Sequence, residues 1–220
     1  MGAYPSRVYV HRLLEQGQVP LWNPYQLGGM PLLADVQVAV YYLPNLVLSF
    51  FYRGQDIPLE AFEALVVFHY ALGAVFMFGF LRNLRVSTWA ALLGAIAFEF
   101  NGFFVGHHGH YSMFSVVVWV PAILWMLDQS WKHPKFSSQL FYATIAGLFM
   151  SQLLMGGHPQ LAFYGGLFIL CYFLFRWGMQ IQIWRFLLFM DGWRGFITNP
   201  IVQMPILIAI AGFLGIGISA

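Results

Sequence analysis

Six stretches of the chain are almost wholly apolar over close to the ~20 residues that an α-helix needs to cross a hydrocarbon core about 30 Å thick. Short connections containing Gly, Pro, His or Arg separate most of them. This pattern predicts six membrane-crossing helices. They are expected at Glu60–Leu81, Ser87–Val105, Tyr111–Leu127, Ser137–Met155, Leu161–Trp177 and Ile201–Ser219.

Two further apolar stretches are too short to cross a bilayer. Val38–Tyr52 is broken by Pro44 and Asn45, which predicts an interfacial or re-entrant segment. Ile181–Met190 contains Arg185, and a short apolar stretch with a cation favours an amphipathic helix on the membrane surface.

The composition agrees with a membrane protein. Of the 220 residues, 60% are hydrophobic and 8% are charged, whereas soluble domains carry about 25% charged residues. So few charges cannot cover a globular surface in water, but lipid can surround apolar side chains instead. The expected fold class is therefore all-α, with a polytopic transmembrane helical bundle at 59–220 and a polar N-terminal segment at 1–58.

Several functions have no support in the sequence. The basic residues are scattered and form no stripe, so no nucleic-acid partner is expected. The chain has no Gly-rich phosphate loop, no dinucleotide-binding Gly motif and no Gly-x-Ser-x-Gly motif, and we expect no cofactor. The single cysteine, Cys171, can form no internal disulfide.

The distribution of Lys and Arg predicts the orientation, because cytoplasmic connections carry an excess of both. The connections after the first, third and fifth spans carry Arg82, Arg85, Lys132, Lys135, Arg176, Arg185 and Arg194. The connections at 106–110 and 156–160 carry none. Segments 1–58, 106–110 and 156–160 are therefore expected on the non-cytoplasmic face, although Arg7, Arg12 and Arg53 run against the rule.

The two ends of the chain predict a fragment of a longer protein. Residues 1–20 contain no apolar stretch that could act as a signal peptide. A segment on the non-cytoplasmic face needs a means of export, so we expect a further transmembrane helix upstream. The chain also ends inside an apolar span, at Ala220.

The polar loop from Pro20 to Pro31 is the first candidate site. Trp22 could stack on a sugar ring, and the Asn23 amide offers both a donor and an acceptor. The alternative is a structural turn, in which Pro24 and the pair Gly28-Gly29 set the backbone and Trp22 anchors the loop at the membrane surface.

Two acidic residues are the catalytic candidates. Asp35 follows the polar loop, with Gln37 nearby as a ligand-binding residue. Its carboxylate could act as a general base or hold a metal, or it could simply be solvated or cap a turn. Glu99, followed by Asn101, lies inside the second span, where a charged group needs a cavity or a partner. His69, near mid-membrane in the first span, is interpreted as an interhelical hydrogen-bonding residue.

Histidines mark the next two connections of the same predicted face. They are His107, His108, His110 and His158, and Gln160 lies beside the last of them. Their spacing fits no regular metal-ligand pattern, so we expect no metal site. Phosphate binding and a plain polar surface remain the alternatives, and His158 is favoured because flanking glycines let a ligand approach the backbone.

The residues in these loops resemble a known family. Gly17 to Gln37 and the following Tyr42-Leu-Pro-Asn45 resemble the first extracytoplasmic loop of bacterial YfhO-like membrane proteins. The later matches are Asn101-Gly-Phe-Phe104, His107, Met113, Trp119-Val-Pro121 and Gly157-His-Pro-Gln160. The resemblance covers the chain, with gaps, from about Tyr4 to its end.

This resemblance implies a fold similar to the GT-C glycosyltransferases of the bacterial inner membrane, which take a sugar from a polyprenyl-phosphate carrier at the outer face. In such enzymes an essential Asp follows the first transmembrane helix, and that position would precede Tyr4. The likeness therefore implies that the usual catalytic Asp is missing, with Asp35 or Glu99 as the substitute. Membrane lipid and a lipid-linked sugar are the implied partners.

Three functions stay open at this point. The first is a GT-C-type glycosyltransferase or a piece of one. The second is a non-catalytic subunit packed against other membrane subunits, and the third is a transporter for a lipid-linked substrate. The first predicts one pocket near the membrane surface whose walls include Trp22, Asn23, Asp35, Glu99, Asn101 and His158.

Overall fold

The computed structural model describes residues 4–191 and 200–219, with side-chain surroundings for 4–179 and 205–219. We call residues 4–58 the head and the helices after it the bundle. The head contains α1 (Tyr4–Glu15), β1 (Trp22–Asn23), β2 (Met30–Pro31), the 3-10 turn η1 (Val36–Val38) and α2 (Leu43–Phe51). The bundle contains α3 (Leu59–Asn83), α4 (Thr88–Glu99), α5 (Gly102–Gly106), α6 (Tyr111–Val117), α7 (Trp119–Lys132), α8 (Phe136–Met155), α9 (Pro159–Asp191) and α10 (Pro200–Ser219).

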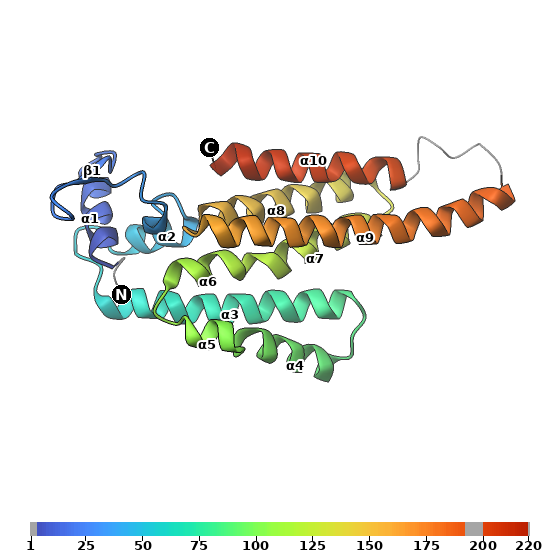
Figure 1. Cartoon of the computed structure of the whole chain (residues 1–220), viewed down its shortest axis with the longest axis horizontal. Helices are drawn as coiled ribbons and strands as arrows, with labels where there is room; N and C mark the ends of the chain where they lie inside the picture. Colours follow the sequence, from blue (N-terminus) through green and yellow to red (C-terminus); the bar gives the residue numbers. More distant parts are fainter. Residues whose placement is uncertain (1–3, 192–199, 220) are drawn as a thin grey trace.

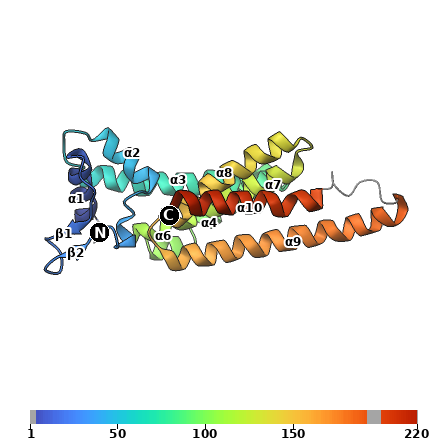
Figure 2. The same cartoon turned by 90° about the horizontal axis from the view of Figure 1, so that it is seen from above.

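The bundle helices run up and down side by side, and the head sits across one end of them (Figure 1). We call this the head end. The connections α5–α6 and α8–α9 also lie there, as does the C-terminal end of α10 (Figures 1 and 2). The structure therefore gathers segments 4–58, 106–110 and 156–160 at one end of the bundle, as the sequence predicted.

Within the described residues, five helical stretches are long and apolar enough to cross a membrane. They are Leu59–Asn83, Thr88–Gly106, Tyr111–Lys132, Phe136–Met155 and Pro159–Met179. These confirm five of the six expected spans and the all-α class of a multi-pass membrane protein. The sixth expected span coincides with α10, and the part of it described with its side chains, Pro205–Ser219, is apolar.

One expected element was wrong. Residues 181–190 do not form a separate surface helix, because α9 continues without a break from Pro159 to Asp191 and extends past the neighbouring helices (Figure 1). Residues 181–190 contain no Pro or Gly that would interrupt the helix, whereas the sequence interpretation had taken this short stretch, with Arg185 inside it, as a helix of its own.

The Tyr111–Lys132 span forms the centre of the bundle, since 72% of it is buried, compared with 17–39% of the other spans. It packs on α3 and on α8, and α8 in turn packs on α10. The span changes from α6 to α7 at Val118. Pro121 explains this break, because it has no N–H to donate to the carbonyl four residues earlier.

A chain of buried hydrogen bonds fastens the head to the bundle. The His69 Nδ1–H donates to the Leu65 carbonyl at 2.7 Å, so Nε2 is the acceptor for the Tyr42 hydroxyl, also at 2.7 Å. The Trp119 indole N–H donates to the same hydroxyl at 2.8 Å. His69 thus acts as a hydrogen-bonding residue between segments, as interpreted: its own partner is Tyr42 in the head, and Tyr42 in turn links it to Trp119 in α7.

Glu99 lies between α3 and α4, directly against Gly73. A Cβ atom on Gly73 would stand 2.0 Å from Glu99 Oε1 and 3.1 Å from a methyl carbon of Val118. The absence of a side chain at Gly73 therefore makes the space in which the carboxyl group is buried.

We expect Gly73→Ala to lower the free energy of unfolding by about 1–3 kcal/mol, the usual cost of overpacking. Unfolding can be followed by SDS titration in mixed micelles. Gly166→Ala is the matched control, because Gly166 is also helical and a Cβ there meets nothing within 4 Å. Equal stability of the two variants would contradict the tight contact with Glu99.

Candidate functional site

A cavity of about 530 Å³ opens between the head and the α5–α6 connection. We call it the polar cavity. Its lining residues are Ser6, Gln26, Asp35, Gln37, Val38, Phe62, Gly109, His110, Tyr111 and Ser112. It brings together three of the predicted site residues, Asp35, Gln37 and His110, from two segments that lie more than 70 positions apart in the chain.

Asp35 is held in place by its own turn. Its backbone is extended and it caps η1, with Oδ1 accepting a hydrogen bond from the Gln37 N–H at 3.1 Å. The side chain is half-buried. The expectation that Asp35 caps a turn is therefore confirmed. Capping uses only Oδ1, so the second carboxylate oxygen, Oδ2, remains available to a ligand.

A second, mainly apolar cavity of about 140 Å³ shares Asp35 with the first. We call it the apolar cavity. It lies where η1 meets the α8–α9 turn and the end of α10. Its lining residues are Leu33, Asp35, Val36, Ala39, Val40, Tyr41, Leu154, Met155, Gly157, Pro159 and Ser219.

Gly157 makes the close approach between η1 and the α8–α9 turn possible. Its φ is +94°, a conformation that favours glycine, and a Cβ there would stand 2.8 Å from the Val36 carbonyl oxygen. The turn and η1 therefore touch through their backbones.

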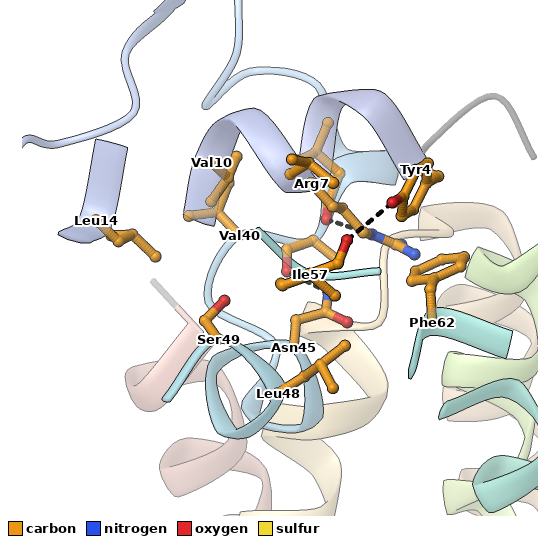
Figure 3. Close-up of a pocket in the computed structure, with 13 residues that line it drawn as sticks. Tyr4, Arg7, Val10, Leu14, Val40, Asn45, Leu48, Ser49, Ile57 and Phe62 are labelled. Carbon is orange, nitrogen blue, oxygen red and sulfur yellow. Dashed lines mark hydrogen bonds between the residues drawn. The ribbon is translucent and has the colours of Figure 1, made fainter. Parts of the chain in front are cut away.

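Arg7 places a positive charge behind the wall of the polar cavity. Its side chain projects from α1 toward Phe62, past Tyr4 and Ile57 (Figure 3). Nε donates to the Val38 carbonyl and Nη2 to the Gln37 carbonyl, both at 3.1 Å. The guanidinium also lies 4.0 Å from the centre of the Tyr111 ring.

Arg7 is buried, and burial disfavours its charged form, but the side chain keeps its positive charge. Burial lowers the pKa of the guanidinium to about 10, so the group remains a cation at neutral pH. The two carbonyl groups and the ring of Tyr111, all belonging to residues that line the polar cavity, supply the compensating negative charge density. An anion in the cavity would be attracted through this wall.

Three of the four candidate histidines make local hydrogen bonds to the backbone, and the fourth, His110, lines the polar cavity. His107 Nδ1 donates to the Phe103 carbonyl at 2.8 Å, and His108 Nδ1 to the Val105 carbonyl at 3.1 Å. His158 is half-buried and accepts from the Leu161 N–H at 3.4 Å, which caps α9. His110 is exposed and lines the polar cavity.

Gln160 donates to the Tyr164 hydroxyl at 3.1 Å on the first turns of α9. It is exposed. This contact is local to the helix, so Gln160 is oriented by its own helix rather than by the cavity walls.

Trp22 and Asn23 lie in the short hairpin of the head. The Trp22 ring rests on Gly29, where a Cβ would stand 2.7 Å from the indole. Asn23 is buried, accepts from the Tyr25 N–H at 3.0 Å and donates to Gln26 Oε1 at 3.1 Å. Both side chains thus take part in the turn itself, whereas anchoring of Trp22 at the membrane surface stays a prediction. Asn23 also lines a groove along α1.

The expectation of one pocket with all six residues was wrong. Glu99 is 1% exposed and lines neither the polar nor the apolar cavity, and within the described residues neither of its carboxylate oxygens has a hydrogen-bond partner. Asn101 joins α4 to α5: its Oδ1 caps Phe103 and Phe104, and its Nδ2 donates to the Phe98 carbonyl. Asp35 is thus the better catalytic candidate of the two acidic residues.

A charged cluster that the sequence reading missed lies at the other end of the bundle. Asp128 is 0% exposed and accepts from Arg176 at 2.5 Å and from Asn83 at 2.7 Å, with Lys132 Nζ at 2.9 Å. These contacts tie α3, α7 and α9 together. The spacing of Asp128 and Lys132 by four was a visible signal, but the partner Arg176 is 48 positions away.

Among the residues that the structure describes, no three His, Cys, Asp or Glu side chains are grouped so that they could hold a metal ion. The imidazole rings of His107 and His110 have their centres 6.0 Å apart. That the protein uses no metal and no cofactor stays a prediction.

Comparison of the chain with protein-family models, with curated proteins and with solved structures finds no match. The likeness to YfhO-like proteins and to GT-C glycosyltransferases therefore rests on the residues quoted above.

Proposed function

We propose that this chain is a glycosyltransferase of the membrane, or part of one, that takes a sugar from a polyprenyl-phosphate carrier. The observation that carries the proposal is the position of Asp35, which lies in the walls of both the polar and the apolar cavity. A substrate with a polar head and a lipid tail needs two such compartments side by side.

The two cavities match the two halves of such a substrate. The apolar cavity touches the head-end termini of α8, α9 and α10, where a prenyl chain could enter from the bilayer. The polar cavity carries Gln26, Gln37, His110 and Ser112, which offer donors and acceptors to sugar hydroxyl groups.

The phosphate would lie at the junction of the cavities. Arg7 supplies a fixed positive charge behind the wall of the polar cavity, and the exposed His110 is among the residues that line this cavity. A preorganised cation stabilises the negative charge that grows on a departing phosphate. This assigns a supporting electrostatic role to Arg7, which does not itself need to touch the substrate.

In the proposed reaction the acceptor hydroxyl gives its proton to the Asp35 carboxylate. The acceptor oxygen then forms a bond to the anomeric carbon of the sugar, from the face opposite the phosphate. The bond between the anomeric carbon and the phosphate oxygen breaks, and its electron pair leaves with polyprenyl phosphate. The configuration of the sugar is inverted.

The same proposal fixes the location. With Lys and Arg concentrated at the opposite end of the bundle, the head would face the outside of a bacterial inner membrane. Arg7 and Arg12, which run against that rule, are both engaged within the head, Arg7 with backbone carbonyls and Arg12 with Asp56 at 2.6 Å. Membrane lipid, a lipid-linked sugar and further membrane subunits are the proposed partners.

A photoreactive residue in the apolar cavity tests substrate binding. We expect Tyr41→p-benzoylphenylalanine, in the chain reconstituted in nanodiscs, to cross-link to radiolabelled undecaprenyl-phosphate glucose. Unlabelled undecaprenyl phosphate should compete, because it shares the chain and the phosphate. Tyr41 is half exposed, so the substitution leaves the core intact.

The matched control is the same photoreactive residue at Phe141, an exposed aromatic position of α8 on the far half of the bundle. Labelling there should be weak and should not be competed. Equal labelling at both positions would contradict a specific site. Specific labelling without any transfer of glucose would favour the non-catalytic subunit instead.

A further inference from the structure

A groove of about 910 Å³ runs along α1 on the side of the hairpin. We call it the α1 groove. This volume lies near the upper end of the range of about 300–1,000 Å³ found for ligand pockets. Its lining residues are Tyr4, Pro5, Ser6, Val8, Tyr9, Arg12, Leu13, Gln16, Gln18, Asn23, Tyr25, Gln26 and Asp56.

The charges in the α1 groove cancel. Arg12 donates two hydrogen bonds to Asp56, from Nε to Oδ1 and from Nη2 to Oδ2, both at 2.6 Å. This pairing raises the pKa of Arg12 and lowers that of Asp56, so both remain charged around neutral pH and neutralise each other. The groove therefore offers no net charge to a ligand.

Uncharged polar groups make up most of the remaining polar surface. Gln16 and Gln18 are exposed just after α1, and Asn23 and Gln26 also line the groove, with the Asn23 amide donating to Gln26 Oε1. A side-chain amide presents a donor and an acceptor side by side, which suits neighbouring hydroxyl groups on one ring.

Tyrosines supply flat apolar surface beside these amides. Tyr25 is 83% exposed and meets Tyr9 edge to face, with ring centres 5.4 Å apart. Apart from this edge contact the Tyr25 ring is exposed, so most of its surface is available to cover the C–H face of a sugar ring.

The α1 groove leads to the polar cavity. Ser6 and Gln26 line both, and the Ser6 hydroxyl donates to Gln26 Oε1 at 3.0 Å, where the Asn23 amide also donates. This small cluster is the ridge between the two spaces. A chain lying in the groove would thus bring its end over the ridge to Asp35.

We propose that the α1 groove binds a neutral carbohydrate chain, the acceptor of the transferred sugar. That the chain is the acceptor of the sugar rests on the proposed function, whereas the binding of a neutral glycan rests on the groove alone. The paired charges of Arg12 and Asp56 disfavour acidic and basic ligands, and the amides and tyrosines suit sugar rings. A glycan that crosses the ridge shared with the polar cavity would place its terminal hydroxyl near Asp35.

Saturation-transfer NMR on the full chain in phospholipid nanodiscs tests the binding, since sugar-headed detergents would compete. The probes are cellotriose, maltotriose and tri-N-acetylchitotriose, with trigalacturonate as the acidic counterpart. We expect at least one neutral trisaccharide to bind and trigalacturonate not to bind. Tyr25→Ala should weaken the binding about tenfold, the effect of losing roughly 1.4 kcal/mol of stacking.

Phe51→Ala is the matched control, because Phe51 is an exposed aromatic of the head that lies outside the groove. It should leave the affinity for the trisaccharide as it is. Binding of none of the neutral probes, stronger binding of trigalacturonate, or equal loss in Tyr25→Ala and Phe51→Ala would each overturn the proposal.

The two proposals fail separately. If the chain transfers glucose and Tyr25→Ala does so with an unchanged KM for the acceptor, the groove assignment is wrong and the transferase stands. If a neutral trisaccharide binds but Tyr41→p-benzoylphenylalanine captures no lipid-linked glucose, the groove stands as a glycan-binding site and the transferase is wrong.

Discussion

Asp35→Asn is expected to lower the rate of glucose transfer from undecaprenyl-phosphate glucose by about 10²–10⁴-fold, the usual contribution of a general base. Asparagine keeps the oxygen that caps η1 through the Gln37 N–H, so the turn should keep its shape. It cannot take the proton of the acceptor hydroxyl. The loss should therefore appear in kcat, with little change in the KM for the lipid-linked donor.

The measurement is the appearance of labelled glycan product from reconstituted chain, with cross-linking at Tyr41 as a check that the donor still binds. Glu60→Gln is the matched control, since it removes an exposed carboxylate in the first turn of α3 at the same end of the bundle. A transfer rate in Asp35→Asn within a few-fold of wild type would rule out Asp35 as the base.

Asp128→Ala is expected to lower the free energy of unfolding by about 2–4 kcal/mol. Removing one partner of a buried ion pair usually costs about 3–5 kcal/mol. The expected loss is smaller here because the side chains of Arg176 and Lys132 are 33% and 39% exposed and can reach water when Asp128 is absent. The loss should be visible in SDS titration and as a lower thermal midpoint.

Arg176→Met and the double variant complete a mutant cycle. If Asp128 acts by neutralising Arg176, the double variant should be less destabilised than the sum of the two single ones. Asp56→Ala, which removes an exposed ion pair with Arg12, should change stability far less than Asp128→Ala. Equal effects of these two anions would contradict the structural role of the buried cluster.

Hydropathy alone predicted most of the bundle. Five of the six expected spans agree with the structure, because lipid replaces water around them and every residue of a span must be compatible with it. The segment Val38–Tyr52 was also correctly kept apart from the spans, since Pro44 lies in the first turn of a short helix, α2, and no long one. These are properties of single segments, which a local pattern can report.

The long-range partners in the site came only from the tertiary structure. Asp35 was visible as a candidate, but its place in two cavity walls depends on His110 from the α5–α6 connection and Gly157 from the α8–α9 turn. Glu99 was visible too, and only packing against Gly73 removed it from the site.

The contacts of two charged residues, Arg7 and Arg176, could not be predicted from the sequence either. In the sequence Arg7 runs against the rule that Lys and Arg lie on the cytoplasmic side, and Arg176 follows it. Neither observation indicates which residue each side chain contacts. The structure pairs Arg7 with carbonyl groups 30 and 31 positions away and Arg176 with Asp128 48 positions away. A sequence pattern specifies which side chains avoid lipid, but the packing of the helices decides which of them meet.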